Sequence, residues 1–362
     1  MTLYDIIVDS AKAALNLLRG DGSIPEGHNG PYRDPETPVR NTAHWLISFA
    51  KAHSITADSR FMEAVERCSD YLTNDKARPM DGAFFCRTNP EKDFCNGLIG
   101  QAWVFEALKT ASDVLGDDVY IGLARDVYKK HPFDEKSGLW RRLNVDGSYN
   151  DFDMTFNHQL WFAACSTLIG ETSSEIGQQV ERFIGNLNKN LLARGSGRIA
   201  MYVPESAVDG AFVGSIKALR RKFTTNAERR RFEKEREIGY HQFNLYAFAM
   251  LREKFGDNPF WHSRRFVSIL KYIETSEYKT AIRANTFGYP YNPPGFECAY
   301  AILAFPEHFD EPEKLAKSWV TEQIKKCFNH ETNLMSLNSS DEATSAARIY
   351  EATRLPNMEL EI

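Results

Sequence analysis

Residues 94–108, FCNGLIGQAWVFEAL, and residues 156–170, FNHQLWFAACSTLIG, share the pattern that decides the fold. Each opens with polar residues and continues as a run that is apolar around its whole circumference and rich in alanine and aromatic residues. Such a run is typical of a helix that is buried on all sides. Four further segments have the same character: NTAHWLISFAKAH (41–53), GYHQFNLYAFAML (239–251), GFECAYAILAF (295–305) and DEATSAARIYEAT (341–353).

Helices with one charged face alternate with these buried segments. We expect them at residues 1–20, 59–72, 117–130, 173–192, 262–274 and 311–328. Gly22, Gly82, Gly138 and Gly197 add a second periodicity, at intervals of 60, 56 and 59 residues. Repetition at a fixed period indicates a repeated supersecondary unit. The sequence therefore predicts an all-α fold, an (α/α)6 barrel of six helical hairpins. The alternative is an open α-solenoid, which has a shorter and more regular period.

The bulk composition restricts the class of protein. With 362 residues, 43% of them hydrophobic, and no linker, we expect a single domain over 1–362 with a charged insert around 194–237. The net charge of -5 argues against a nucleic-acid partner. Six scattered cysteines indicate buried thiols rather than disulfides, and no Cys/His spacing indicates a metal site. We expect no cofactor, no membrane span and no signal peptide, hence a cytoplasmic location.

Two carboxylates stand at the entries of neighbouring buried helices. Asp93 precedes the second buried segment and Asp153 precedes the third. In a barrel, both would lie at the end of the ring where long aromatic loops gather, and this is a suitable surface for a sugar. Their pKa values could be pushed apart, which would leave one carboxyl group protonated as a general acid. Each could instead only cap its helix.

From about residue 80 to 165 the chain resembles the six-hairpin glycosidases, in particular the unsaturated uronyl hydrolases of glycoside hydrolase families 88 and 105. The likeness lies in DFCNGLIGQAWVFEAL, LGDDVYIGLARDVYKK, SGLWRRL and DMTFNHQLW. It implies that Asp153 is the general acid/base and Asp93 its carboxylate partner, with His158 beside them. The implied reaction is hydration of a 4,5-unsaturated uronic acid. The whole chain also resembles glycan-assembly proteins of the Agl-cluster type.

The substrate is expected to be an oligosaccharide or polysaccharide bound by polar and aromatic groups near the ring entrance. The candidates are Arg40, His44, Asn96, Trp140, Asn157, Trp161, Tyr240, His241, Gln242, Tyr291 and Glu297. The segment EIGYHQFNLYAF stands where the resembled family has an Arg-Gly-Gln-Ala-Trp stretch, which brings Tyr240, His241 and Gln242 into this set.

Two other functions are compatible with the same residues. Asn157, His158, Arg236 and Tyr240 are similar to the Asn/His/Tyr/Arg sets of polysaccharide lyases, and a uronate C5 epimerase would use the same first step. A non-catalytic glycan-assembly partner on this scaffold is the other function. The charged insert is either a solvated helix or a basic lid over an anionic glycan or a lipid phosphate.

Overall fold

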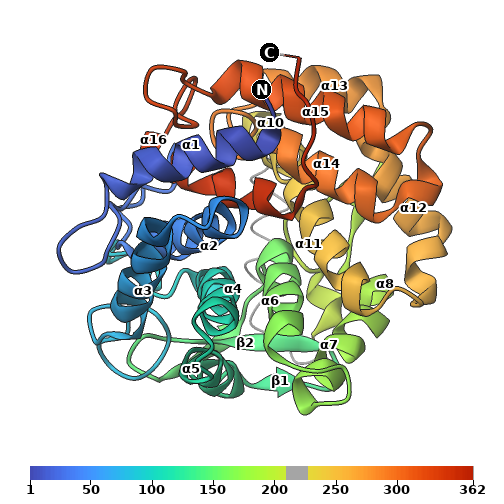
Figure 1. Cartoon of the computed structure of the whole chain (residues 1–362). Helices are drawn as coiled ribbons and strands as arrows, with labels where there is room; N and C mark the ends of the chain where they lie inside the picture. Colours follow the sequence, from blue (N-terminus) through green and yellow to red (C-terminus); the bar gives the residue numbers. More distant parts are fainter. Residues whose placement is uncertain (209–226, 362) are drawn as a thin grey trace.

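The computed structural model describes residues 1–208 and 227–361 and has the expected barrel of helical hairpins (Figure 1). In the described residues the inner ring consists of α2 (Val39–Thr56), α4 (Gly97–Leu115), α6 (Phe156–Ile169), α11 (His241–Lys254), α14 (Pro294–Ala304) and the consecutive short helices α16 (Glu342–Ala347) and η7 (Arg348–Arg354). Each inner helix contacts the next, and η7 contacts both α14 and α2. The ring is therefore closed, and the open α-solenoid is excluded.

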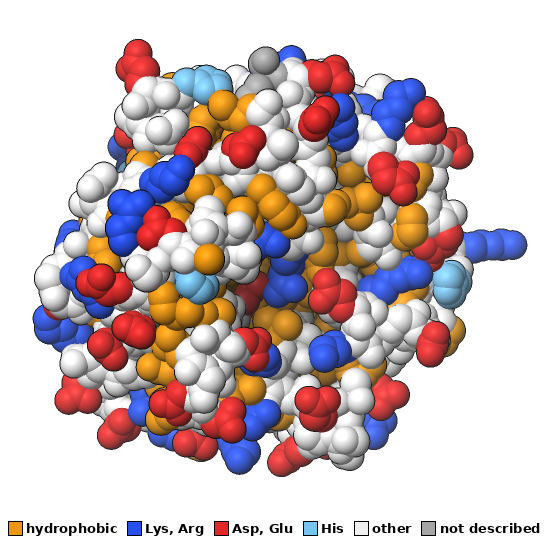
Figure 2. Space-filling model, in the orientation of Figure 1, with side chains coloured by type: hydrophobic (Ala, Val, Ile, Leu, Met, Phe, Trp, Pro, Cys, Tyr) orange, Lys and Arg blue, Asp and Glu red, His pale blue; other side chains and the backbone are white. Residues whose placement is uncertain are grey.

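An outer layer covers the ring and follows the expected alternation. It consists of α1 (Leu3–Leu15), α3 (Ser59–Thr73), α5 (Val119–Lys129), α7 (Glu175–Gly185), α8 (Leu187–Asn190), α12 (Arg264–Lys271), α13 (Ser276–Arg283) and α15 (Pro312–Cys327). The ends of the chain meet here, because the N–H of Leu3 donates to the carbonyl of Met358. The outer helices pack their apolar faces on the ring and leave charged side chains of both signs interspersed on the surface view (Figure 2).

The sequence predicted helix at two of the remaining elements: α10 (Ala227–Gly239), which fits the solvated helix considered for the charged insert, and η5 (Tyr272–Glu274), which ends the outer helix expected over 262–274. The other short elements were not expected from the sequence. They are β1 (Phe133–Asp134), β2 (Leu139–Leu143), β3 (Tyr149–Phe152), β4 (Ala193–Arg194), β5 (Arg198–Ile199) and the 3-10 turns η1 (Gly30–Tyr32), η2 (Glu205–Ala207), η4 (Pro259–His262) and η6 (Pro306–His308). β1, β2 and β3 form an antiparallel sheet ahead of α6, and β4 pairs with β5. Of the charged insert, residues 209–226 lie outside the described part, and α10 forms its end.

One hydrogen bond recurs in the first four hairpins and explains the glycine periodicity. In each, the residue two positions after the glycine donates its backbone N–H to a polar side chain on the following inner helix. The pairs are Ile24 to Thr42 (2.9 Å), Phe84 to Gln101 (2.7 Å), Trp140 to Gln159 (3.0 Å) and Ile199 to Nδ1 of His241 (3.3 Å). This bond ties each entry loop to the ring, so the loops at this end are held in a fixed register.

The glycines allow these entry loops to approach the next outer helix closely. A Cβ on Gly22 would lie 2.1 Å from the carbonyl oxygen of Arg67, and one on Gly197 would lie 2.1 Å from that of Ser268. Both glycines also have positive φ angles, of 84° and 118°. A larger residue would push the loop off the outer helix, so glycine is needed at both positions.

Candidate active site

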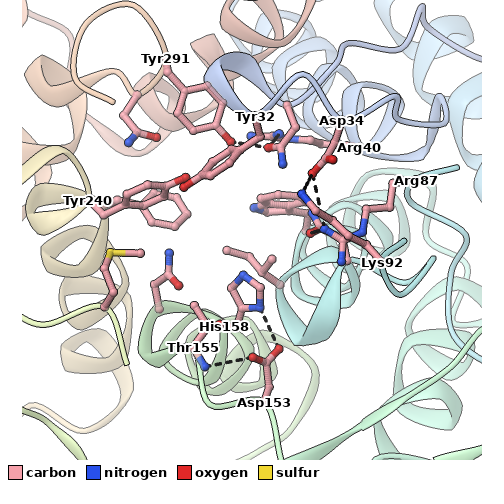
Figure 3. Close-up of a pocket in the computed structure, with 18 of the residues that line it drawn as sticks. Tyr32, Asp34, Arg40, Arg87, Lys92, Asp153, Thr155, His158, Tyr240 and Tyr291 are labelled. Atoms are coloured by element: carbon pink, nitrogen blue, oxygen red, sulfur yellow. Dashed lines mark hydrogen bonds and ion pairs between the residues drawn. The ribbon is translucent and has the colours of Figure 1, made fainter. Parts of the chain in front are cut away.

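A pocket of about 240 Å³ opens where the N-terminal ends of the inner helices meet. Its walls come from the segment around η1, the loop before α4, the start of α6, the end of α10 and the start of α11 (Figure 3). The volume is near the lower end for ligand pockets, which suits one or two small rings better than a long polymer segment.

Asp153 and His158 form the wall at the start of α6. Nδ1 of His158 lies 2.8 Å from Oδ2 of Asp153, which also accepts the N–H of Leu98, while Oδ1 accepts the N–H of Thr155. Burial raises the pKa of Asp153, but His158 and the two backbone donors outweigh it, and the pKa falls to about 2. Asp153 is therefore a carboxylate at neutral pH. The carboxylate holds Nδ1 of His158, so Nε2 is the ring nitrogen that remains to interact with a ligand in the pocket.

Gly97 makes this arrangement possible. Its φ is +59°, and a Cβ at this position would lie 2.3 Å from Oδ2 of Asp153 and 2.6 Å from Nδ1 of His158. Only glycine allows both the left-handed backbone and the close approach. The first turn of α4 therefore contacts the Asp153–His158 pair directly.

Asp93 meets Asp153 at the same helix end. Its Oδ1 accepts the N–H of Gly97 at 2.8 Å, and Asp153 accepts the N–H of the following residue, Leu98. Arg87 and Arg142 each lie 3.0 Å from the Asp93 carboxylate. Burial raises the pKa of Asp93, but Arg87, the Gly97 N–H and Arg142 lower it further than burial raises it. Both carboxyl groups are thus held as anions, which corrects the expectation that one of them stays protonated as a general acid. Each also accepts an N–H from the first turn of α4.

The wall across from α6 is aromatic. Tyr32, Tyr240 and Tyr291 point into the pocket together, and the Tyr291 hydroxyl donates to Asn29 at 2.6 Å (Figure 3). Burial raises the pKa of Tyr240 well above its usual value. Tyr240 therefore stays protonated at neutral pH and can act as a hydrogen-bond donor.

Cations outnumber acids around the pocket. Its lining includes Arg40, Arg87, Lys92, Arg142, Arg236 and Arg348 against Asp34, Asp93 and Asp153. Five of the six cations have a carboxylate partner: Arg40 pairs with Glu36, Arg87 and Arg142 with Asp93, Lys92 with Asp34, and Arg348 with Glu297.

Arg236 differs from these five cations. Among the described residues no carboxylate pairs with it, its Nε is buried without a partner, and its Nη1 donates to the Tyr202 hydroxyl at 3.3 Å. Within the described residues, its charge is therefore not balanced by a carboxylate.

The structure brings eight of the fourteen sequence-predicted residues to the pocket: Asp93, Asp153, His158, Arg40, Asn96, Asn157, Tyr240 and Tyr291. Asn157 is notable among them because its Oδ1 is buried and has no partner in the described residues. An amide oxygen of this kind can accept a hydrogen bond from a sugar hydroxyl.

The other six residues, expected at the entrance, instead lie within the protein beside the pocket. Trp140 donates Nε1 to Tyr128, and Trp161 donates Nε1 to the carbonyl of Phe243. His44 stacks on Tyr350 at 4.1 Å, and Gln242 accepts from Tyr278. Trp140 lies on β2, a strand that was not expected. The others lie on inner helices, and helical periodicity does not show which face of an all-apolar helix meets the cavity.

His241 and Glu297 are buried in structural hydrogen bonds. His241 accepts the N–H of Ile199, and its Nε2 lies 3.0 Å from the carbonyl of Ile269. Glu297 accepts from Arg348 at 2.7 Å, and Arg348 also bonds Glu351. Burial, together with the nearby Glu351, raises the pKa of Glu297 well above its usual value. Glu297 thus reaches the pocket only through Arg348.

Several lining residues were not singled out from the sequence. Tyr32, Asp34, Arg87, Lys92, Trp103, Arg142 and Arg348 fall in loops or on helix faces that the pattern did not orient. A usable signal was the stretch PYRDPETPVR (31–40), in which aromatic and charged residues precede an apolar helix. Arg40, in that stretch, lies 4.2 Å from the ring centre of Trp103.

Metal-binding geometry lies away from the pocket. In the described residues, the group able to hold an ion is His262, Glu307 and His308. It lies in η4 and η6, beyond the C-terminal ends of α11 and α14, whereas the pocket is at the N-terminal ends of the ring. Arg252 already pairs with Glu307 at 2.7 Å. None of the described helices combines the length and apolarity that a bilayer crossing requires.

The closed ring of helical hairpins is that of the six-hairpin glycosidase fold. Solved structures share it over nearly the whole chain: a cellobiose 2-epimerase from Bacillus thermoamylovorans (TM-score 0.66, 11% identity, 94% of both chains) and a D-mannose isomerase (0.65, 12%, 97% of this chain and 95% of that one). An unsaturated glucuronyl hydrolase specific for heparin shares it too (0.60, 12%, 96% of both). At these identities the likeness concerns the fold alone.

A sequence relative defines the family. The chain is 41% identical over 369 residues to archaeal glycosylation protein Q of Haloferax volcanii, with 99% of each chain covered. No family model matches the chain. The chain belongs to the archaeal glycosylation protein Q family.

Proposed function

We propose that this chain is an enzyme that acts on a terminal uronic-acid residue of a glycan, with His158 as the proton carrier. The observation that carries the proposal is the 2.8 Å contact between His158 and Asp153 at the pocket wall. A carboxylate that fixes one imidazole nitrogen and leaves the other facing a ligand is the arrangement of a general acid/base. The name of the Haloferax volcanii relative is consistent with a glycan substrate.

The reaction we propose is hydrolysis through hydration of a 4,5-unsaturated uronyl residue. The His158 imidazolium gives a proton to C4 of the double bond, water adds at C5, and the neutral imidazole takes the proton that this water loses. The hemiketal then collapses and releases the glycosidic bond. Because Asp153 has a pKa of about 2, it orients His158 and does not supply the proton itself. The small pocket favours a chain-end residue over the middle of a polymer.

Arg236 is our candidate for the substrate carboxylate. It is a permanently charged guanidinium without a carboxylate partner in the described residues, and its planar shape suits a carboxylate. Asn157 adds an acceptor for a ring hydroxyl. Asp93 and its two arginines pair with one another and form a part of the wall that shapes the pocket.

The position of Tyr240 favours a second reaction. It lies on the wall across from His158 (Figure 3). A uronate bound between them would have one proton carrier on each face. Removal of the C5 proton by His158 and delivery by Tyr240 would give C5 epimerisation, and loss of the C4 substituent would give a lyase.

The test uses an unsaturated uronyl disaccharide and follows its ultraviolet absorbance. Asp153→Asn and His158→Gln should each lower kcat by about 10³-fold or more, because the imidazole loses its orientation or is absent. Asp151→Asn is the matched control: its side chain is 93% exposed and lies two residues from Asp153.

The possible outcomes separate the candidate functions. Absorbance that appears on intact uronate polymer would establish the lyase. Deuterium taken up at C5 without a change in absorbance would establish the epimerase. Glycan binding without any reaction would show a glycan-assembly partner and would refute the enzyme proposal.

A further inference from the structure

Two histidines and a glutamate come together at the end of the ring opposite the pocket. His262 ends η4, and Glu307 and His308 belong to η6. Each residue offers one ligand atom, and these three atoms lie within 4.8 Å of one another. The two segments are far apart in the sequence, so no ligand spacing could indicate the set. Two imidazoles and one carboxylate are a set of ligands that zinc uses in proteins.

The two connections that carry these residues are held together. They follow α11 and α14, which are neighbours in the ring (Figure 1). The buried ring of Trp261, next to His262, packs on the ring of Phe305 at 5.7 Å and donates its Nε1–H to the carbonyl of Phe255 at 2.7 Å. The N–H of His308 donates to the carbonyl of Phe305 at 3.1 Å. Fixed backbone therefore presents the ligand side chains from both segments.

The Nε2 atom of His308 is the observation that points to an ion. It is buried and has no hydrogen-bond partner in the described residues. It lies 3.6 Å from Oε1 of Glu307, which is too far for a hydrogen bond. A buried ring nitrogen without a partner is costly. An ion bound between His308 and Glu307 would give this nitrogen its partner.

Glu307 is ionised and can bind an ion while it keeps its ion pair. Burial raises its pKa, but a hydrogen bond to its own backbone and the pair with Arg252 lower it further. Nη1 of Arg252 donates to Oε1 at 2.7 Å. A carboxylate has about four lone-pair positions, so the other oxygen can coordinate an ion. Arg252 then orients the carboxylate, as the outer partners of metal ligands commonly do.

We propose that His262, Glu307 and His308 bind a zinc ion that links the connections after α11 and α14. Ligands about 2.1 Å from a tetrahedral zinc lie roughly 3.4 Å from one another, so a shift of about 1 Å in the exposed His262 ring completes the set. The Glu307 side chain is 36% exposed, which leaves water as the fourth ligand. Imidazole ligands favour zinc over magnesium or calcium. This inference is independent of the proposed function.

The experiment titrates zinc chloride into the full chain, freed of metal with a chelator and without an affinity tag, in a calorimeter. We expect one zinc ion per chain, and a rise in Tm of roughly 3 °C when zinc is a hundredfold above Kd. His262→Ala and Glu307→Gln should each weaken binding by about tenfold or more, since even outer partners of metal ligands contribute that much. His330→Ala is the control, because His330 is also exposed and lies outside the set.

Cobalt gives a second measurement at the same site. Co²⁺ in a tetrahedral site absorbs visible light strongly, and this absorbance should be present in the native protein and in His330→Ala but absent in His262→Ala. Both variants of the set replace exposed side chains, and circular dichroism checks that they are folded. A native protein that binds no zinc, or His262→Ala and Glu307→Gln variants that bind it as tightly as the native protein, would overturn the proposal.

Discussion

Asp153 and His158 lie five residues apart at the start of α6, and their side chains meet at 2.8 Å against the backbone of Gly97. The carboxylate has two backbone donors in addition to the imidazole, from Leu98 and Thr155. A buried anion with three donors holds its position firmly. The geometry of this pair therefore depends on the neighbouring helix α4 as well as on α6.

Gly97→Ala should inactivate the protein while leaving it folded. A methyl group would lie 2.3 Å from Asp153 and 2.6 Å from His158, so one of them must move. A shift of about 1 Å in a proton carrier lowers kcat by roughly 10²-fold. We also expect a loss of stability of about 1–3 kcal/mol from the positive φ. Gly122→Ala on α5 is the control, because nothing lies within 4 Å of its Cβ position, and it should be neutral or stabilising.

The contribution of Asp153 to stability should depend on pH. Its pKa is about 2 in the folded protein against 3.8 for an unperturbed aspartate side chain, so the folded state favours the carboxylate. This contribution is present above the unfolded pKa and is lost as the pH falls through the folded one. It is on the order of 2 kcal/mol. Urea unfolding of the native protein and of Asp153→Asn should differ more at pH 6 than at pH 3. An equal difference at both values would show that the carboxylate is not stabilised as described.

Arg236→Gln should raise KM for a uronate substrate by about tenfold to a hundredfold and change kcat less, because we propose that this guanidinium, which has no carboxylate partner in the described part of the chain, binds the substrate carboxylate. Arg236→Lys should recover part of the loss. Arg229→Gln is the control on the same helix, since Arg229 pairs with Glu233 and does not line the pocket. An unchanged KM in Arg236→Gln would remove Arg236 from the site.

His241→Ala should lower the free energy of unfolding by about 1–3 kcal/mol, because the N–H of Ile199 would lose its buried acceptor. His241→Gln should restore part of this loss, since Gln101 and Gln159 make the same bond in their hairpins. Activity per folded molecule should hold in His241→Gln. If His241→Ala were as stable as the native protein but did not bind sugar, His241 would be a substrate-binding residue and not a structural one.

The ring was predictable because its signal is local. A helix that is apolar on all sides, such as residues 94–108, can be recognised from its own residues. Its alternation with helices that have one charged face repeats often enough to indicate the architecture. The entry positions of Asp93 and Asp153 followed from the same alternation, and both do line the pocket. The sixth inner segment was expected over 341–353 and lies there as α16 and η7, but its division into a short α-helix and a 3-10 helix was not predicted, nor was the small sheet before α6.

The sequence alone determined the series of hairpins and the end of the inner helices where polar residues gather, because both depend on the order and period of apolar segments. The contacts of η7 with α14 and α2 decided that the ring is closed. Only the tertiary structure decided which side chains face the cavity. An all-apolar helix has no polar face to orient it, so His158 could not be told from His241 by pattern. In the structure His158 lies beside Asp153 and Gly97 at the pocket, whereas His241 accepts the N–H of Ile199 in the wall.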